Sequence, residues 1–126
     1  QQLSFVAALA LHDALTALTG QPARLALKWP NDVLLDGLKC SGILLERVGD
    51  ALVIGMGVNL ARHPTRTERP ATSLAAAGLP VPTPLALLGE LAPAFASWRG
   101  QWEQAGFAPI RSAWQARAAG LGQRIV

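Results

Sequence analysis

The segment LKWPNDVLLDGLKCSGILLERVGDALVIGMGVNL, residues 27–60, decides the fold expected for this chain of 126 residues. Its apolar runs are interrupted by Pro30, by Asp-Gly at 36–37 and by Gly-Asp at 49–50. The two dipeptides favour tight turns, and proline ends a strand because it lacks the amide hydrogen that a sheet requires. The segment therefore predicts a series of strands that fold back on one another.

The predicted strands differ in length and in pattern. We expect extended segments at 24–28, 33–35, 40–48 and 51–60. Leu25 and Leu27 alternate with other residues, which is typical of a strand with one buried face. The two longest segments are almost continuously apolar, and we expect them near the centre of the sheet.

A helix is predicted before this segment. Ser4 is expected to cap it and Gly20 to end it. Between these two positions leucines recur with helical spacing, at Leu11, Leu15 and Leu18.

Further helices are predicted after it. Thr83-Pro84 is typical of an N-cap followed by proline at the first helical position, and Pro93 should kink or split the helix that follows. Apolar residues recur in that helix at spacings of three and four, at Leu88, Leu91, Phe95, Trp98 and Trp102. A shorter helix is expected over 109–119 and a strand over 123–126. The order of elements predicts an α+β fold, with a mixed or antiparallel sheet flanked by helices.

The composition excludes several classes of protein. The net charge is +3, but the basic residues are scattered without interleaved aromatics, so we expect no nucleic-acid partner for this segment. No apolar run approaches the roughly 20 residues of a membrane span, so no membrane partner is expected. Cys40 is the only cysteine, which excludes an internal disulfide and an all-cysteine metal site. With no recognisable signal peptide, we expect a cytoplasmic location.

Lysine and asparagine are confined to residues 27–60. Lys28 and Lys39 are the only lysines, against nine arginines, and Asn31 and Asn59 are the only asparagines. Arginine presents a rigid planar fork, whereas lysine presents a compact charge that rotates freely. We interpret this block as the place where the function resides.

The run Lys28-Trp29-Pro30-Asn31-Asp32 places a cation, a carboxamide and a carboxylate at the end of a strand. A polyphosphate with its metal ion needs such a mixture, because cations bind phosphate oxygens and carboxylates bind Mg²⁺. A polar exit from a strand, with Trp29 buried in the core, explains the same residues. The run alone leaves both interpretations open.

Glycines accompany the second lysine and the second asparagine. Lys39 precedes Gly42 at the start of an apolar strand, where a glycine lets a ligand approach the backbone closely. Gly55 and Gly57 leave two positions of the next strand without a side chain before Asn59. The third glycine of a dinucleotide-binding fingerprint is missing. An ordinary hairpin lysine and a strand narrowed for helix packing are the structural alternatives.

Other reactive side chains are expected to have structural roles. His12 and His63 have no carboxylate or cysteine at the spacing of a metal site. Cys40 lies beside a lysine but has no histidine base nearby, so we expect a small buried residue. Trp98 and Trp102 are expected in the core.

Four motifs follow one another along the chain: Lys-Trp-Pro-Asn-Asp at 28–32, Lys-x-x-Gly-Ile-Leu at 39–44, Gly-x-Gly-x-Asn at 55–59 and Ala-Thr-Ser-Leu at 71–74. In this order and spacing they closely resemble biotin protein ligase, also called biotin–[acetyl-CoA-carboxylase] ligase. The resemblance covers most of the chain. It implies the catalytic-domain fold shared by biotin and lipoate ligases, which is similar to class II synthetases.

The resemblance implies a reaction with two steps. The family makes biotinyl-5′-AMP from biotin and ATP with Mg²⁺, then passes the biotinyl group to a lysine of a biotin carboxyl carrier protein. Lys39 matches the lysine between the biotin carboxylate and the α-phosphate, and is implied to be catalytic. Lys28 is implied to support the phosphates, and Gly42 and Gly57 to let ligand lie close to the strands.

Further positions are implied to bind the nucleotide. Asn31 and Asp32 would fix nucleotide or Mg²⁺, with Asp32 the implied metal ligand, and Asn59 would contact the adenosine. Residues 61–73 match the loop that closes over the adenylate and keeps water from it. Arginines of this loop are implied to assist, namely Arg62, Arg66 and Arg69.

Part of the family pattern is not found in this chain. A Gly-Arg-Gly-Arg-type loop that grips biotin is expected upstream of Gln1, and residues 61–73 carry no tryptophan to stack on adenine. Residues 1–119 are then the C-terminal portion of a catalytic domain, and 120–126 the first strand of a small barrel. We expect the chain alone to be inactive.

Two other functions fit the same residues. A lipoate or octanoyl ligase shares the fold and the acyl-adenylate chemistry, although the complete Lys-Trp-Pro-Asn-Asp run argues against it. A non-catalytic nucleotide-binding module is the alternative from a different class. A homodimer is also left open by the sequence.

Overall fold

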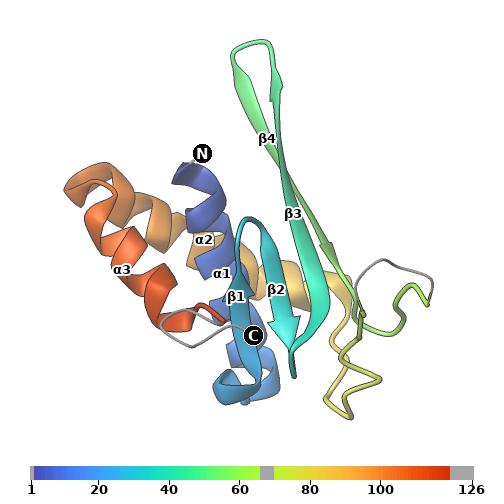
Figure 1. Cartoon of the computed structure of the whole chain (residues 1–126). Helices are drawn as coiled ribbons and strands as arrows, with labels where there is room; N and C mark the ends of the chain where they lie inside the picture. Colours follow the sequence, from blue (N-terminus) through green and yellow to red (C-terminus); the bar gives the residue numbers. More distant parts are fainter. Residues whose placement is uncertain (1, 66–69, 120–126) are drawn as a thin grey trace.

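The computed structural model describes residues 2–65 and 70–119 (Figure 1). In chain order its elements are α1 (Gln2–Thr19), the 3₁₀ helix η1 (Pro22–Arg24), β1 (Leu25–Lys28), β2 (Asp32–Leu35), β3 (Leu38–Val48), β4 (Ala51–Val58), α2 (Pro84–Ala105) and α3 (Ala108–Arg117). The strands form one sheet in the order β1-β2-β3-β4, and each is antiparallel to its neighbour. The helices lie on one side of this sheet (Figure 1): α1 and α3 contact the strands, and α2 packs on α1. The predicted α+β class is confirmed.

Both predicted turn dipeptides join neighbouring strands. Asp36 and Gly37 link β2 to β3 with φ angles of 55° and 81°, and Gly49 links β3 to β4 with a φ of 60°. Glycine adopts a positive φ without steric cost, and aspartate tolerates it better than most residues. The hairpin of β3 and β4 projects well beyond the other elements (Figure 1).

The expected central position is correct for β3 and wrong for β4. Within the described residues β4 pairs with β3 alone, so it forms an edge of the sheet. An apolar run indicates that both faces of a strand are apolar. It does not indicate whether the strand has a neighbour on one side or on both. Leu44, Val48 and Val53 in the hairpin are accordingly exposed.

The helix α1 is the centre of the core. Its residues from Val6 to Leu11 are buried without interruption, against the strands and α2. The predicted cap at Ser4 is wrong, because α1 already includes Gln2 and Leu3, and Leu3 packs against the core. By length and composition α1 is the one described helix that could cross a membrane, but 56% of it is buried inside the molecule, as in other core helices.

The start of α2 follows the sequence, whereas its predicted interruption does not occur. Thr83 Oγ1 accepts a hydrogen bond from the Ala86 amide at 3.1 Å, which confirms the N-cap. The helix continues through Pro93, so the predicted split is wrong. The carbonyl that loses its donor there belongs to Gly89, which is exposed and can bond to water instead.

The apolar face of α2 begins one residue earlier than predicted. Leu88 is 54% exposed, and Leu87, four residues before Leu91, is buried in its place. The remaining predicted positions pack against the core from partly buried sites, at Leu91, Phe95, Trp98 and Trp102. The shorter helix predicted over 109–119 is α3, and its Ile110 and Trp114 are buried. The strand predicted at 123–126 lies outside the described residues.

Candidate functional site

One row of paired residues crosses all the described strands on the sheet face that is turned away from the helices. Lys28 of β1 pairs with Asp32 of β2. The row continues from Asp32 to Gly42 of β3 and from Gly42 to Gly57 of β4. Directly paired residues point to the same face of a sheet, while the next residue, such as the buried Leu27, points to the other face. Four of the predicted site residues are thus neighbours.

A β-bulge brings Lys39 to the same face. The pairing of β2 with β3 shifts between Val33 and Leu34, which makes Cys40 an extra residue in β3. Without the bulge Lys39, three residues before Gly42, would point into the core, because side chains alternate along a strand. The sequence does not predict this bulge, since nothing in the pattern of apolar residues marks it.

The ammonium of Lys39 lies over the glycine of the row. Its Nζ is 3.5 Å from Asp32 Oδ1, longer than a direct hydrogen bond between these groups. A Cβ at Gly42 would lie 3.5 Å from both Cε and Nζ of Lys39. The lysine side chain is 42% exposed and the aspartate 13% exposed. Lys39 is therefore held in place but remains accessible to a ligand.

A cavity of about 200 Å³ opens beside this pair. Two lysines and one carboxylate are among the residues that line it: Lys28, Asp32, Leu34, Gly37, Lys39 and Pro70. Two ammonium groups against one carboxylate leave a local excess of positive charge. The cavity therefore suits an anionic group, such as a phosphate or a carboxylate.

Residues 70–74, at the end of the loop predicted over 61–73, form hydrogen bonds with Lys39 and with Asn59. The Lys39 amide donates to Pro70 O at 3.1 Å, and Lys39 O accepts from the Thr72 amide at 2.9 Å. On the other side Asn59 Nδ2 donates to Thr72 O at 3.1 Å, and Asn59 O accepts from the Leu74 amide at 3.1 Å. The structure gives Asn59 the role of an anchor for this segment, and its contact with adenosine stays a prediction.

The other predicted nucleotide-binding residues lie further from the row. Asn31 extends the pairing of β2 with β3, because its carbonyl accepts the Ile43 amide at 2.9 Å. Arg62 is exposed in the irregular segment after β4 and does not line the cavity. Arg66 and Arg69 lie outside the described residues.

Trp29 is not a core residue. It is 64% exposed at the connection between β1 and β2, and its ring centroid lies 5.5 Å from that of Phe5. Phe5 also contacts Phe107 and Trp114, so these three rings already fill the adjacent part of the core. The structural alternative, in which Trp29 fills the core, is therefore wrong.

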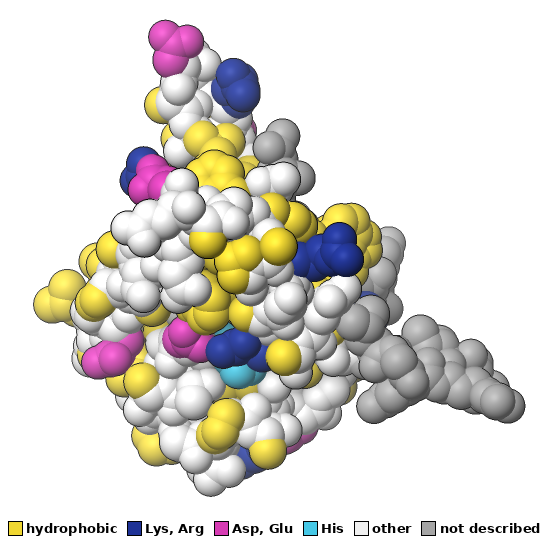
Figure 2. Space-filling model, turned by 90° about the vertical axis from the view of Figure 1, so that its left-hand side faces the viewer, with side chains coloured by type: hydrophobic (Ala, Val, Ile, Leu, Met, Phe, Trp, Pro, Cys, Tyr) yellow, Lys and Arg dark blue, Asp and Glu magenta, His cyan; other side chains and the backbone are white. Residues whose placement is uncertain are grey.

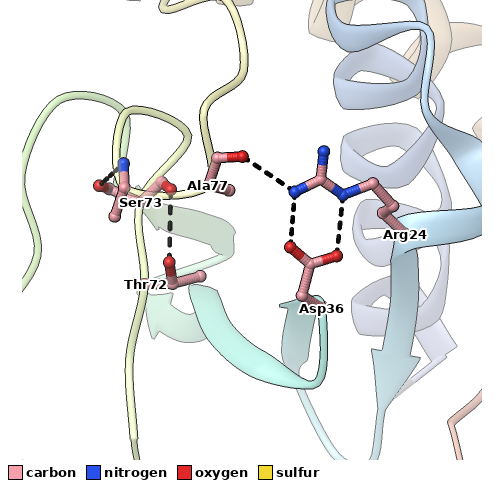
Figure 3. A network of polar contacts seen from close by, with 6 residues as sticks. Arg24, Asp36, Thr72, Ser73 and Ala77 are labelled. Atoms are coloured by element: carbon pink, nitrogen blue, oxygen red, sulfur yellow. Dashed lines mark hydrogen bonds and ion pairs between the residues drawn. The ribbon is translucent and has the colours of Figure 1, made fainter.

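A second polar cluster stabilises the opposite end of β2 (Figure 3). Arg24 donates from Nε and Nη2 to the carboxylate of Asp36 at 2.8 and 2.6 Å, and from Nη2 to Ala77 O at 2.9 Å. Hydrogen bonding to the guanidinium lowers the pKa of Asp36 and raises that of Arg24. This cluster joins the turn after β2 to the segment that carries Thr72 and Ser73.

The reactive side chains outside the row have structural surroundings. Cys40 is fully buried, and burial raises the pKa of its thiol to about 11, as expected for a structural residue. His63 Nδ1 lies 3.4 Å from Ser73 Oγ. No group of three or more histidine, cysteine or acidic side chains suited to a metal occurs among residues 2–65 and 70–119. Asp32 alone fits Mg²⁺ only if the metal arrives with phosphate ligands.

The fold and the row define a class of protein: an α+β domain that presents two lysines and a carboxylate on the open face of an antiparallel sheet, as suits an anionic ligand. The model of the biotin/lipoate A/B protein ligase family matches residues 1–116. The chain belongs to this family.

Relatives with curated names agree with this assignment. The chain is 51% identical, over 99% of its length, to biotin–[acetyl-CoA-carboxylase] ligase from Paracoccus denitrificans, and covers 56% of that protein. It is 35% identical, over 98% of its length, to the enzyme of the same name from Mycobacterium tuberculosis, of which it covers 46%. The chain thus spans about half the length of these relatives.

Solved structures show the same fold. A mutant biotin protein ligase from Aquifex aeolicus in complex with biotin matches 97% of the chain with a TM-score of 0.84 and 26% identity, and the chain covers 52% of it. The Aquifex aeolicus ligase in complex with biotin and ATP matches 94% of the chain with a TM-score of 0.81 and 25% identity, and the chain covers 51% of it. The predicted catalytic-domain fold is confirmed.

Proposed function

We propose that the intact protein activates biotin with ATP to biotinyl-5′-AMP and transfers the biotinyl group to a lysine of a biotin carboxyl carrier protein. The observation that carries this proposal is the ammonium of Lys39, held over Gly42 and beside Asp32 at a positively charged cavity. The names of the relatives support the same reaction.

Lys39 would act in the first step. An oxygen of the biotin carboxylate attacks the α-phosphorus of ATP, a carboxylate–phosphorus bond forms, and pyrophosphate leaves. The two reacting groups are both anionic, so a cation between them lowers the repulsion that builds up as they approach. A lysine fits this crowded position because its charge is compact and rotates to follow the oxygen atoms.

The neighbouring residues would bind the rest of the nucleotide. Lys28 extends the positive charge towards the phosphates. Asp32 would bind Mg²⁺ together with phosphate oxygens, and the metal would neutralise charge on the leaving pyrophosphate. Asn31 and Asn59 would contact the nucleotide, and Arg62 would assist from the loop that follows β4.

The loop at residues 61–73 would protect the intermediate. Acyl adenylates hydrolyse in water, so a loop that closes over the product preserves it for the carrier. The hydrogen bonds of Lys39 and Asn59 to residues 70–74 hold one end of this loop beside the cavity. Cytoplasmic location and homodimerisation stay predictions from the sequence.

The test measures exchange of radiolabelled pyrophosphate into ATP by the intact protein, with biotin, lipoate or octanoate as the acid. Exchange that requires biotin, followed by transfer to an added carrier domain, is the expected result. Exchange that requires lipoate or octanoate would assign the protein to that branch of the family. Binding of ATP without exchange in a folded protein would instead favour the non-catalytic module.

A further inference from the structure

Residues 70–74 hold Lys39 through both its amide and its carbonyl. The Lys39 amide donates to Pro70 O at 3.1 Å, and Lys39 O accepts from the Thr72 amide at 2.9 Å. Ala71, between these two residues, forms an isolated parallel bridge with Lys39. Pro70 and Lys39 both line the cavity of about 200 Å³. The position of residues 70–74 therefore sets the position of the Lys39 backbone, from which the ammonium extends into the site.

Ser73 is a buried residue of this segment. Only 1% of it is exposed, and Figure 3 shows it next to Thr72, whose hydroxyl lies 3.4 Å from Ser73 O. Ser73 Oγ accepts a hydrogen bond from the Ala76 amide at 3.0 Å. A serine hydroxyl donates as well as accepts, so its own hydrogen is left for a second partner. Because an unpaired buried donor is costly, that partner has to lie within the fold.

The two histidines of the chain join different parts of the fold. His12 is buried in α1, and its Nε2 lies 3.4 Å from the carbonyl oxygen of Leu25 in β1. Figure 2 shows a histidine beside acidic and basic side chains on the side of the molecule that faces left in Figure 1. His63 is half-buried in the segment after β4, and its Nδ1 lies 3.4 Å from Ser73 Oγ. His12 thus joins a helix to a strand, whereas His63 joins two irregular segments.

The His63 ring supplies the second partner of the Ser73 hydroxyl. A neutral imidazole that carries its hydrogen on Nε2 has a bare lone pair on Nδ1, and this nitrogen then accepts from Ser73 Oγ. The next residue is held by the backbone, since the Leu74 amide donates to Asn59 O at 3.1 Å. The histidine adds a side-chain contact at Ser73 itself, one residue nearer to Thr72. Loss of this contact would free the part of the segment that bonds to β3.

We propose that His63 is a positioning residue for Lys39 and that it acts through Ser73. The hydrogen bond fixes the Ser73 side chain, residues 70–73 then stay against the start of β3, and the ammonium of Lys39 stays where the carboxylate and the α-phosphate meet. A charge that stabilises a transition state has to be in place before the reaction, so a loosely held lysine is a poorer catalyst. This role rests on the proposed function, whereas the contact between His63 and Ser73 does not depend on it.

The test compares hydrogen–deuterium exchange of single backbone amides in two variants of the intact protein. His63→Asn keeps a polar atom at the position of Nδ1, whereas His63→Phe keeps the ring and removes both nitrogens. The amides of Lys39 and Thr72 are expected to exchange about five- to tenfold faster in His63→Phe, and close to the parental rate in His63→Asn. The Ile43 amide of the same strand, which donates to Asn31 O, is the control and should keep its parental rate in both variants.

The partner of His63 provides a second test. Ser73→Ala removes the hydroxyl, and His63→Phe should add no further acceleration at the Lys39 amide when Ser73 is already alanine. Additive acceleration contradicts the proposal, because the ring would then act without Ser73. Equal acceleration in His63→Asn and His63→Phe assigns the effect to packing of the ring, and acceleration that includes Ile43 assigns it to general loosening of the sheet. Either of these outcomes, or no acceleration in His63→Phe, overturns the proposal.

Activity provides an independent readout. His63→Phe should lower the kcat of biotin-dependent pyrophosphate exchange about fivefold, with little change in the KM for ATP, and His63→Asn should retain most of the parental kcat. An unchanged kcat in His63→Phe, despite faster deuteration of the Lys39 amide, would overturn the positioning role. Deuteration needs no substrate, so a parent protein that fails to exchange pyrophosphate refutes the proposed function alone, and the amide rates still decide the contact.

Discussion

The two ends of β2 carry the same kinds of charge in different arrangements. At its end Arg24 and Asp36 form two hydrogen bonds of 2.8 and 2.6 Å, and Arg24 also binds Ala77 O. At its start Lys39 and Asp32 are 3.5 Å apart, and a glycine lies beneath the ammonium. The arginine binds its carboxylate and a carbonyl through Nε and Nη2, whereas the looser lysine pair keeps room for a ligand.

The difference explains the choice of residue at each end. A guanidinium binds a carboxylate through two parallel bonds and so fixes a turn to its neighbours. An ammonium in a loose pair can exchange one oxygen partner for another without rearranging the backbone. The chain has nine arginines and two lysines, and both lysines lie at the cavity. We infer that at the two ends of β2 Arg24 serves structure and Lys39 serves binding.

Substitution of Lys39 should give the largest effect. We expect Lys39→Ala in the intact protein to lower the rate of adenylate formation by about 10²–10³, because the charge between two reacting anions is lost. Lys39→Arg should also lose most activity, since the wider guanidinium does not fit over Gly42. Pyrophosphate exchange under saturating biotin and ATP measures both.

The matched substitution at the other end of β2 is Arg24→Lys. This substitution keeps the positive charge at a position outside the cavity. The rate of pyrophosphate exchange should therefore be retained, while the melting temperature should fall slightly. If Lys39→Ala forms adenylate at the parental rate, the assignment of Lys39 is wrong. If Arg24→Lys abolishes exchange in a folded protein, the contrast between the two ends fails.

The next largest effect is expected at the glycine end of the row. Nothing lies within 4 Å of a Cβ at Gly57, so Gly57→Val should fold normally, and valine favours strands. Its side chain would stand on the sheet face proposed to bind ligand, and we expect roughly tenfold weaker binding of a stable biotinyl-AMP analogue. Calorimetric titration measures the affinity.

Gly55→Val is the control for this prediction. Gly55 lies on the same strand and the same face, but two residues further from the lysines, beside Leu44. It should leave the affinity unchanged. Full binding by Gly57→Val would show that ligand does not lie over this part of the sheet.

The sequence predicted the strands and turns well because the signals there are local. Asp-Gly and Gly-Asp dipeptides mark turns by their own backbone preferences, and Thr83-Pro84 marks a helix start in the same way. The edge position of β4 and the exposure of Trp29 depend on what packs beside them. The residues next to β4 and Trp29 in the sequence do not indicate which parts of the fold pack beside them.

The structure brings several of the predicted site residues together, but the sequence did not predict the geometry by which they meet. The motifs named Lys28, Lys39 and Asp32, yet their meeting depends on a bulge at Cys40 and on the pairing register. A one-residue shift in either would place Lys39 on the core face. The anchoring role of Asn59 was missed because its partner Thr72 is supplied by a segment 13 residues later.

A smaller effect, on stability alone, is expected for Asp36→Asn. Asparagine retains the positive φ of the turn and removes the charge that Arg24 binds. We expect the melting temperature at pH 7 to fall by roughly 1–4 °C, as for an exposed ion pair in a domain of this size. Pyrophosphate exchange should be unaffected.

The pH dependence tests the cause of that change. The guanidinium lowers the pKa of Asp36 in the folded state, so the pair contributes fully above the unfolded pKa of about 3.9 and is lost as pH falls through the lower folded value. The difference in melting temperature between the parent and Asp36→Asn should therefore shrink below pH 4. A difference that is constant from pH 7 to pH 2 would assign the effect to the turn rather than to the charge.

The smallest effect is expected at Cys40, which adjoins Lys39 in sequence but points away from it. A cation in contact would depress the thiol pKa, whereas burial raises it to about 11, so only about one thiol in a thousand is ionised at pH 8. Iodoacetamide should label Cys40 no faster than the protein unfolds, and Cys40→Ala should keep the exchange rate at a cost of about 1 kcal/mol in unfolding free energy. Rapid labelling of the folded protein, with loss of exchange, would mean that the bulge does not separate the two side chains. In that case the loose pair of Lys39 and Asp32 would owe its geometry to something other than the extra residue in β3.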